Sequence, residues 1–219
     1  MTGQWVRAPR QERARRTFER VLDAGAELLA EQGYEGFAIS EVCRRAQVSP
    51  GALYGRITSK DTLFLAIHQR EMTRILAEVT ALFADGPHWQ ALPLDALVVE
   101  TIRRLGEHYR RHEALLRVFI LRSAVDDRVR AEGEDASGRL LDLLSDLLLT
   151  RRDQLARIHA DPTTAVRTVC RIAFDSLAWR TAFGIGFAEP QTTRSDNTEH
   201  WSERLSRVCA TYLLTPDTR

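Results

Sequence analysis

Apolar residues recur every three to four positions along most of the 219-residue chain. This spacing places apolar side chains on one face of an α-helix, whereas the strict alternation that is typical of strands is absent. We therefore predict an all-α protein. The helices are expected over residues 11–32, 39–46, 50–57, 60–83, 94–109, 113–121, 128–159, 162–187 and 198–214.

Glycine and proline mark the breaks between these helices. Gly33 is expected to stop the first helix, and the segment DGPHWQALP, residues 85–93, is expected to be a loop. The sequence GEDASG, residues 133–138, is a candidate break in a long helical segment. We expect a basic arm over residues 1–10, a small helical domain over 11–70 and a larger one over 71–219, joined within the helix that begins near Lys60.

Composition restricts the class of protein. With 44% apolar residues, the chain is long enough to bury a substantial core. Cys43, Cys170 and Cys209 are far apart and lack a CxxC spacing, which argues against a disulfide framework and favours a reducing cytosol. The first residues lack the apolar stretch of a signal peptide, and no run reaches the 18 apolar residues of a membrane span. We expect a cytoplasmic protein without a cofactor or a metal.

Charge is concentrated at the start of the chain, although the net charge is only +1. Residues 1–20 hold six arginines and two glutamates, a local charge of +4. Arg10, Arg13, Arg15 and Arg16 could neutralise phosphates or enter a minor groove, or they could form an ordinary solvated helix face. The charge pattern leaves both interpretations open.

Two short helices joined by a three-residue turn form a candidate helix-turn-helix over about residues 38–57. Ser49 can cap the second helix, Pro50 suits its first position, and Gly51 allows a phosphate backbone to approach closely. In such a motif the second helix presents its first residues to the major groove. A helical hairpin inside an ordinary bundle would give the same pattern of short helices.

The stretch GYEGFAISEVCRRAQVSPGALYGRITSKDTLFLAI, residues 33–67, resembles the DNA-binding domain of the tetracycline-repressor (TetR) family of bacterial transcription regulators. The resemblance covers about residues 11–70, and for 71–219 it implies an all-α effector-binding and dimerisation domain. The residues that match the family's motif are Gly33, Tyr34, Val42, Ala46, Val48, Ser49, Gly51, Leu53, Tyr54, Ser59, Lys60 and Leu63.

The resemblance also implies roles for individual residues. Lys60 is the one lysine in a chain whose other basic residues are arginine, and it stands where the family places a phosphate contact. A compact ammonium at a helix N-terminus suits that contact. Tyr54 is expected on a phosphate, and Ser40 on a base or a phosphate. The residues expected to face bases are Pro50, Gly51 and Ala52.

Three departures from the family pattern bear on the operator sequence. Ala38 replaces the usual Thr or Ser cap, a loss of about 1 kcal/mol, and leaves Glu41 as half of a capping box. Gln47 replaces a turn glycine, where a left-handed backbone would be unfavourable. Arg56 and Ile57 replace a His-Phe pair, so that Arg56 can contact a phosphate or a guanine.

The last two helices are implied to form a homodimer interface. The helix at 162–187 is apolar on more than one side, which fits two partners, although a fully buried helix would look the same. The last helix carries one broad apolar stripe. The residues expected at the interface are Val169, Leu177, Trp201, Leu205, Val208 and Tyr212.

Aromatic and polar-tipped residues of the larger domain are candidates for an effector pocket, and equally for the core. They are Trp89, His108, Tyr109, Phe119, Phe174 and Trp179. His108 and His112 have a spacing that can hold a metal on a helix, but the arginines between them favour a surface pair.

Together these features predict a ligand-responsive DNA-binding regulator, a repressor of a palindromic operator that a small organic effector releases. The alternative is a helical small-molecule sensor or interaction protein that no longer binds DNA. An enzyme is disfavoured because the sequence lacks a nucleophile elbow, a P-loop and a GxGxxG motif.

Overall fold

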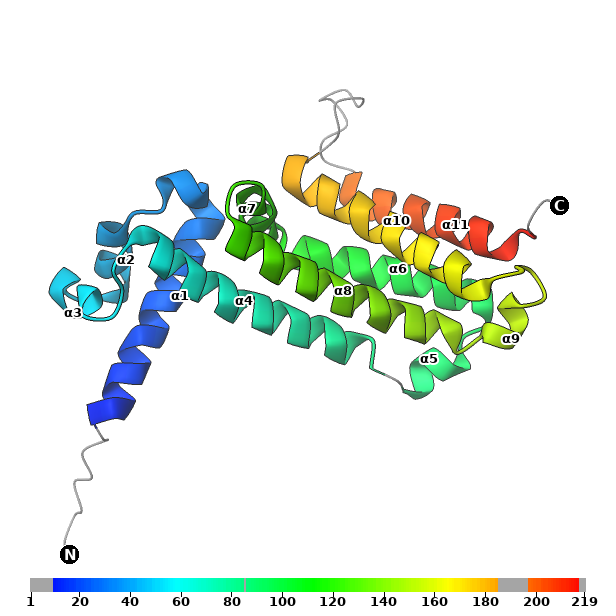
Figure 1. Ribbon diagram of the computed structural model, residues 1–219, viewed down its shortest axis with the longest axis horizontal. Helices are drawn as coiled ribbons and strands as arrows, with labels where there is room; N and C mark the ends of the chain where they lie inside the picture. The colour runs from blue at the N-terminus through cyan, green and yellow to red at the C-terminus, as the bar shows by residue number, and fades with distance from the viewer. Residues whose placement is uncertain (1–9, 85, 185–196, 217–219) are drawn as a thin grey trace, which may run out of the picture. The chain divides into compact units, whose positions relative to one another are not determined.

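The computed structural model describes residues 10–84, 86–184 and 197–216, and this part of the chain contains helices and no strands (Figure 1). The expected all-α class is confirmed. The helices are α1 (Arg10–Gly36), α2 (Ile39–Ala46), α3 (Pro50–Tyr54), α4 (Lys60–Leu82), α5 (Pro87–Ala91), α6 (Leu94–Arg111), α7 (Glu113–Ser123), α8 (Asp127–Leu149), α9 (Arg152–Leu155), α10 (Pro162–Phe183) and α11 (Asn197–Leu214).

The chain divides into two compact units, and the boundary lies inside α4. Unit 1 comprises Met1–Glu71, and unit 2 comprises Met72–Arg219. Within the described residues, no helix combines the length and the apolarity that crossing a membrane requires.

Unit 1 is built from α1, α2, α3 and the first half of α4. Helix α1 is interrupted at Gly33, whose φ of 67° and ψ of −174° are not helical, and the expectation that Gly33 stops the first helix is confirmed. A positive φ is easily reached only by glycine. The helices bury a common set of apolar side chains, each at most 2% exposed: Leu28, Leu29, Phe37, Val42, Leu53, Ile57, Leu63, Phe64 and Ile67.

Unit 2 is a bundle in which α6 lies against α11, and α8 and α10 pack on each other and on α7 (Figure 1). The second half of α4 contributes Ile75 and Val79 to the same core. The α6–α11 contact is close at Gly106, where an added Cβ would lie 2.7 Å from the Cβ of Ser202. Glycine is therefore needed at this position for packing.

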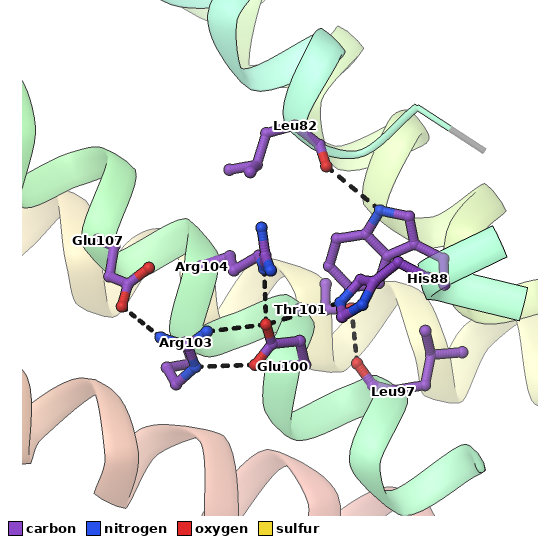
Figure 2. A network of polar contacts seen from close by, with 9 residues as sticks. Leu82, His88, Leu97, Glu100, Thr101, Arg103, Arg104 and Glu107 are labelled. Atoms are coloured by element: carbon purple, nitrogen blue, oxygen red, sulfur yellow. Dashed lines mark hydrogen bonds and ion pairs between the residues drawn. The ribbon is translucent and has the colours of Figure 1, made fainter. Parts of the chain in front are cut away.

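Residues 85–93 were expected to form a loop, but within them Pro87–Ala91 form helix α5, so this expectation is wrong there. The indole of Trp89 is only 4% exposed and donates a hydrogen bond from Nε1 to the carbonyl of Leu82, at 3.2 Å. The guanidinium of Arg104 lies over the indole ring, 5.6 Å from its centroid, and also donates to Glu100 (Figure 2). These contacts come from other elements, so local glycine and proline signals do not reveal the helix.

The long segment 128–159 is broken, but not at residues 133–138. Helix α8 runs without interruption through Gly133 and Gly138 and ends at Leu149, before the short helix α9. An added Cβ would meet nothing within 4 Å at either glycine, so both are tolerated helix residues rather than breaks. Helix α10 ends at Phe183 before Gly184, whose φ is 74°, and the expected continuation to residue 187 lies outside the described residues.

Exchanging Gly106 for alanine should destabilise unit 2, because the new methyl group must displace Ser202. We expect a loss of about 1–3 kcal/mol in the free energy of unfolding. Gly138→Ala is the matched control and should gain about 0.5–1 kcal/mol, because an open helical site favours alanine over glycine. Urea denaturation followed by circular dichroism measures both, and equal shifts of the same sign would contradict this account of the α6–α11 contact.

Candidate nucleic-acid interface

The turn between α2 and α3 has the geometry of a helix-turn-helix. Gln47 has φ 54° and ψ 48°, so it adopts the left-handed backbone that the family's glycine would adopt more easily. The amide of Val48 donates to the carbonyl of Cys43 at 3.0 Å, which closes the end of α2. A left-handed conformation is unfavourable for glutamine, and its presence shows that the surrounding structure dictates this turn.

Helix α3 begins with the expected cap. The hydroxyl of Ser49 accepts a hydrogen bond from the amide of Ala52 at 3.3 Å, and Pro50 occupies the first position of the helix. The helix is shorter than expected and ends at Tyr54 rather than at Ile57. Short isolated helices are unstable in water, so α3 depends on this cap and on burial of its apolar side.

The two sides of α3 differ sharply in exposure. Leu53 and, just beyond the helix, Ile57 are each 2% exposed, whereas Tyr54 is 55% exposed. Pro50, Gly51 and Ala52 are also exposed. A Cβ on Gly51 would meet nothing within 4 Å, so packing within this chain does not require a glycine there. At the start of α3, the side chains that face outward are small and uncharged.

Lys60 is held in place at the first residue of α4. Its Nζ lies 4.4 Å from the centroid of the Tyr34 ring, a cation–π contact. The hydroxyl of Tyr34 donates to Asp61, and its ring meets Phe64 edge to face at 5.1 Å. Ser59 caps α4 by accepting from the amide of Thr62 at 3.1 Å. The ammonium therefore has a defined position; sequence reasoning missed the part played by Tyr34.

Arg56 is also held by an aromatic ring. It is exposed, and its guanidinium carbon lies 5.6 Å from the ring centroid of Phe18 on α1. Arg13 is exposed on the same helix. Arg10 begins α1, but its side chain and residues 1–9 of the expected arm lie outside the described residues.

Several arginines of unit 1 are paired within the chain. Arg15 and Arg16 both bind the carboxylate of Glu12, at 3.1 and 3.0 Å. Arg44 and Arg45 both bind Glu41, and these hydrogen bonds lower the pKa of that carboxyl to about 2. Such pairs reduce the positive charge that these residues offer to a polyanion.

The start of α2 is uncapped, as expected. Ala38 has the extended backbone of an N-cap, with φ −114° and ψ 132°, but provides no side-chain hydrogen bond. The carboxylate of Glu41 pairs with the two arginines of α2. Ser40, in the first turn, is exposed.

The residues expected in an effector pocket differ in burial and in their ring contacts. Tyr109 and Phe174 meet edge to face at 6.2 Å, and His108 lies beside His112. Phe119 is 3% exposed. Trp89 instead packs on Phe83, with ring centroids 5.5 Å apart. Trp179 is 53% exposed, which sets it apart from the buried members.

The residues expected at a dimer interface also separate by exposure. Val169, Leu177 and Leu205 are buried in the core of unit 2, whereas Val208 and Tyr212 are 63% and 45% exposed. The ring of Trp201 is partly exposed and lies under the guanidinium of Arg180, at 4.7 Å.

A row of apolar side chains on α10 was missed as a group by sequence reasoning. Ile172, Trp179 and Phe183 are 46%, 53% and 51% exposed. Their spacing of seven and four residues places them on one side of the helix. The buried and exposed sides of α10 both read as apolar in the sequence, so only the structure separates them.

The fold and the turn geometry define a helix-turn-helix protein with a second, larger helical unit. Residues 21–67 match the family model described as "Bacterial regulatory proteins, tetR family". This segment is therefore similar to the DNA-binding domain of TetR-family transcriptional regulators.

Known relatives agree with this assignment. The chain is 39% identical to the A-factor receptor protein of Streptomyces griseus over 66 residues, which are 30% of this chain and 24% of the relative. It is 32% identical to the transcriptional repressor KstR of Mycolicibacterium smegmatis over 126 residues, 57% of this chain and 58% of the relative. These matches therefore span less than two thirds of either relative.

A solved structure extends the likeness of fold to both units. A TetR-family regulator from Mesorhizobium loti superposes with a TM-score of 0.68 at 19% identity, over 92% of this chain and 96% of that one. At this level of identity the likeness concerns the fold.

Restoring the missing cap of α2 should stabilise unit 1. The extended backbone of Ala38 already suits a capping side chain, so Ala38→Ser should gain about 1 kcal/mol in the free energy of unfolding. Ser40→Ala, an exposed change in the same turn, is the control and should stay within about 0.5 kcal/mol of the wild type. Chemical denaturation measures both values. An Ala38→Ser protein no more stable than the control would show that the end of α2 is satisfied in another way.

Proposed function

We propose that this protein is a ligand-responsive transcriptional regulator that binds operator DNA through α3. The observation that carries the proposal is the exposed row Pro50, Gly51, Ala52 and Tyr54, which stands on buried Leu53 and is flanked by Arg56 and Lys60. The match of residues 21–67 to the TetR family model supports the same function.

In this proposal, α3 enters the major groove, and its first residues, Pro50, Gly51 and Ala52, face the bases. Small apolar side chains there suit contact with a thymine methyl group. Lys60, Tyr54 and Arg56 bind phosphates and fix the register, since phosphate contacts position a protein without reading sequence. Ser40 and Arg13 are further contacts on exposed positions of α2 and α1.

We further propose that residues 11–70 form the DNA-binding domain and residues 71–219 bind an effector and dimerise. One similar protein is named a receptor and another a repressor, which supports a repressor that a small organic effector releases from a palindromic operator. Tyr109 and Phe174 remain the candidate pocket residues that contact each other. The exposed apolar row of α10, with Val208 and Tyr212 of α11, supports a homodimer.

A second candidate function is a helical sensor that no longer binds DNA. The uncapped start of α2 at Ala38 favours it, because a hydroxyl at that position would also offer a phosphate contact. Selection of genomic fragments by the purified protein separates the two functions. Recovery of a palindromic fragment whose binding weakens with salt supports the regulator; recovery of none supports the sensor.

Removing the ammonium of Lys60 should weaken binding to all DNA sequences about equally. Lys60→Ala should also reduce the slope of log K against log salt by about 1, because one phosphate contact is lost. Arg139→Ala removes an exposed cation of α8 in unit 2 and is the matched control, with no expected change in slope. Titrations of a selected fragment at several salt concentrations give the slopes. An unchanged slope for Lys60→Ala would exclude this residue from the DNA contact.

Placing a charge in the apolar row of α10 should separate the proposed dimer. We expect the wild type to scatter light as a dimer at micromolar concentration and Trp179→Glu to scatter as a monomer, because a buried unpaired carboxylate strongly opposes association. Val125→Glu is the control, since Val125 is an apolar residue 73% exposed outside this row. A monomeric wild type, or equal effects of both changes, would contradict the proposed interface.

A further inference from the structure

Three potential metal ligands of unit 2 come together from α4 and α6. Glu78 lies on α4, His108 lies one turn before the end of α6, and His112 is the C-cap of α6. One ligand atom from each lies within 4.8 Å of the other two. The expectation that the two histidines form a surface pair is wrong, because they are 4% and 8% exposed.

Glu78 and His112 are already in contact. The Nε2 atom of His112 lies 2.8 Å from Oε2 of Glu78, a hydrogen-bonding distance. The other carboxylate oxygen of Glu78, Oε1, lies 3.8 Å from Nε of Arg74. This ion pair joins adjacent turns of α4 and is exposed. The rings of His108 and His112 are 4.8 Å apart and inclined at 60°. Sequence reasoning saw the two histidines but not the carboxylate, which comes from another helix.

His108 has an unfilled hydrogen-bonding position at this cluster. Its Nε2 is buried and has no hydrogen-bond partner among the described residues. Burying a polar atom without a hydrogen bond is unfavourable. The neutral imidazole nitrogen is the commonest metal ligand in proteins, so this buried position suits a metal ion.

We propose that Glu78, His108 and His112 bind a divalent first-row transition metal ion, Zn²⁺ foremost, between α4 and α6. Two imidazole nitrogens and one carboxylate oxygen form a common three-residue zinc ligand set, which leaves a fourth position open to water or another donor. The metal gives the buried Nε2 of His108 a partner that the described residues do not provide. It also replaces the Glu78–His112 hydrogen bond with two coordinate bonds.

The side chains must adjust slightly to bind the ion. Ligand atoms about 2.0–2.2 Å from a tetrahedral zinc ion lie about 3.3 Å from one another. The Glu78–His112 pair at 2.8 Å therefore opens, and the widest pair of the set closes from its present separation of up to 4.8 Å. Glu78 has the freedom to move because its side chain is 37% exposed.

Metal titration tests the site without reference to DNA. Protein stripped with a chelator is titrated with Co²⁺, followed by its visible absorption, and with Zn²⁺ in competition with a chromophoric chelator. We expect one ion per chain, and an affinity at least about 10-fold lower in Glu78→Gln and in His108→Asn. His88→Gln and Glu107→Gln, which alter one histidine and one glutamate outside the cluster, should bind as the wild type does.

The proposal is overturned if the wild-type protein binds neither ion. It is also overturned if the Glu78 and His108 variants bind the ions as the wild type does, or if the two control variants lose binding as well. Circular dichroism checks that each variant is folded. If His108→Asn does not fold, the test rests on Glu78→Gln, because the Glu78 side chain is partly exposed and the protein tolerates the change there. These readouts involve unit 2 alone, so failure of the metal site leaves the proposed DNA binding standing, and the converse also holds.

Discussion

Burial of Leu53 and Ile57 is the constraint on which the proposed recognition surface depends. Helix α3 spans only Pro50–Tyr54, too short to be stable by its own hydrogen bonds. Its position comes from these two apolar anchors, from the Ser49 cap at its start and from the left-handed turn at Gln47 before it. Because the anchors take up the inner side, every residue of the outer side is free to serve recognition rather than folding.

Electrostatic pairing within unit 1 explains why its many arginines give a less basic surface than their number suggests. Glu12 and Glu41 each bind two arginines on their own helix. Arg45 additionally bridges to Glu31 of α1 at 2.7 Å, so it helps to join the two helices. By contrast, Lys60 and Arg56 rest on aromatic rings, which orient a cation without neutralising it.

The sequence was sufficient to predict the helical class, the helix-turn-helix and the Ser49 cap, because these follow from local spacing and turn chemistry. Features fixed by contacts between distant elements were not predicted. Helix α5 depends on Trp89 bonding to Leu82, and the burial of His108 depends on the packing of α6 in its bundle. The two sides of α10 are equally apolar in the sequence, so Val169 could not be told from Trp179.

The single ammonium of Lys60 has a practical consequence for chemistry on this chain. Acylating reagents that modify lysine do not modify arginine under the same conditions. Lys60 is therefore the one side-chain amine of the sequence that can react with them, and a free α-amine is the other reactive amine. Acetylation there would remove both the charge and the attraction to the Tyr34 ring. The same amine is the one side-chain attachment point of this kind for a fluorophore beside α3, and in the proposed complex the bound nucleic acid would shield it from the reagent.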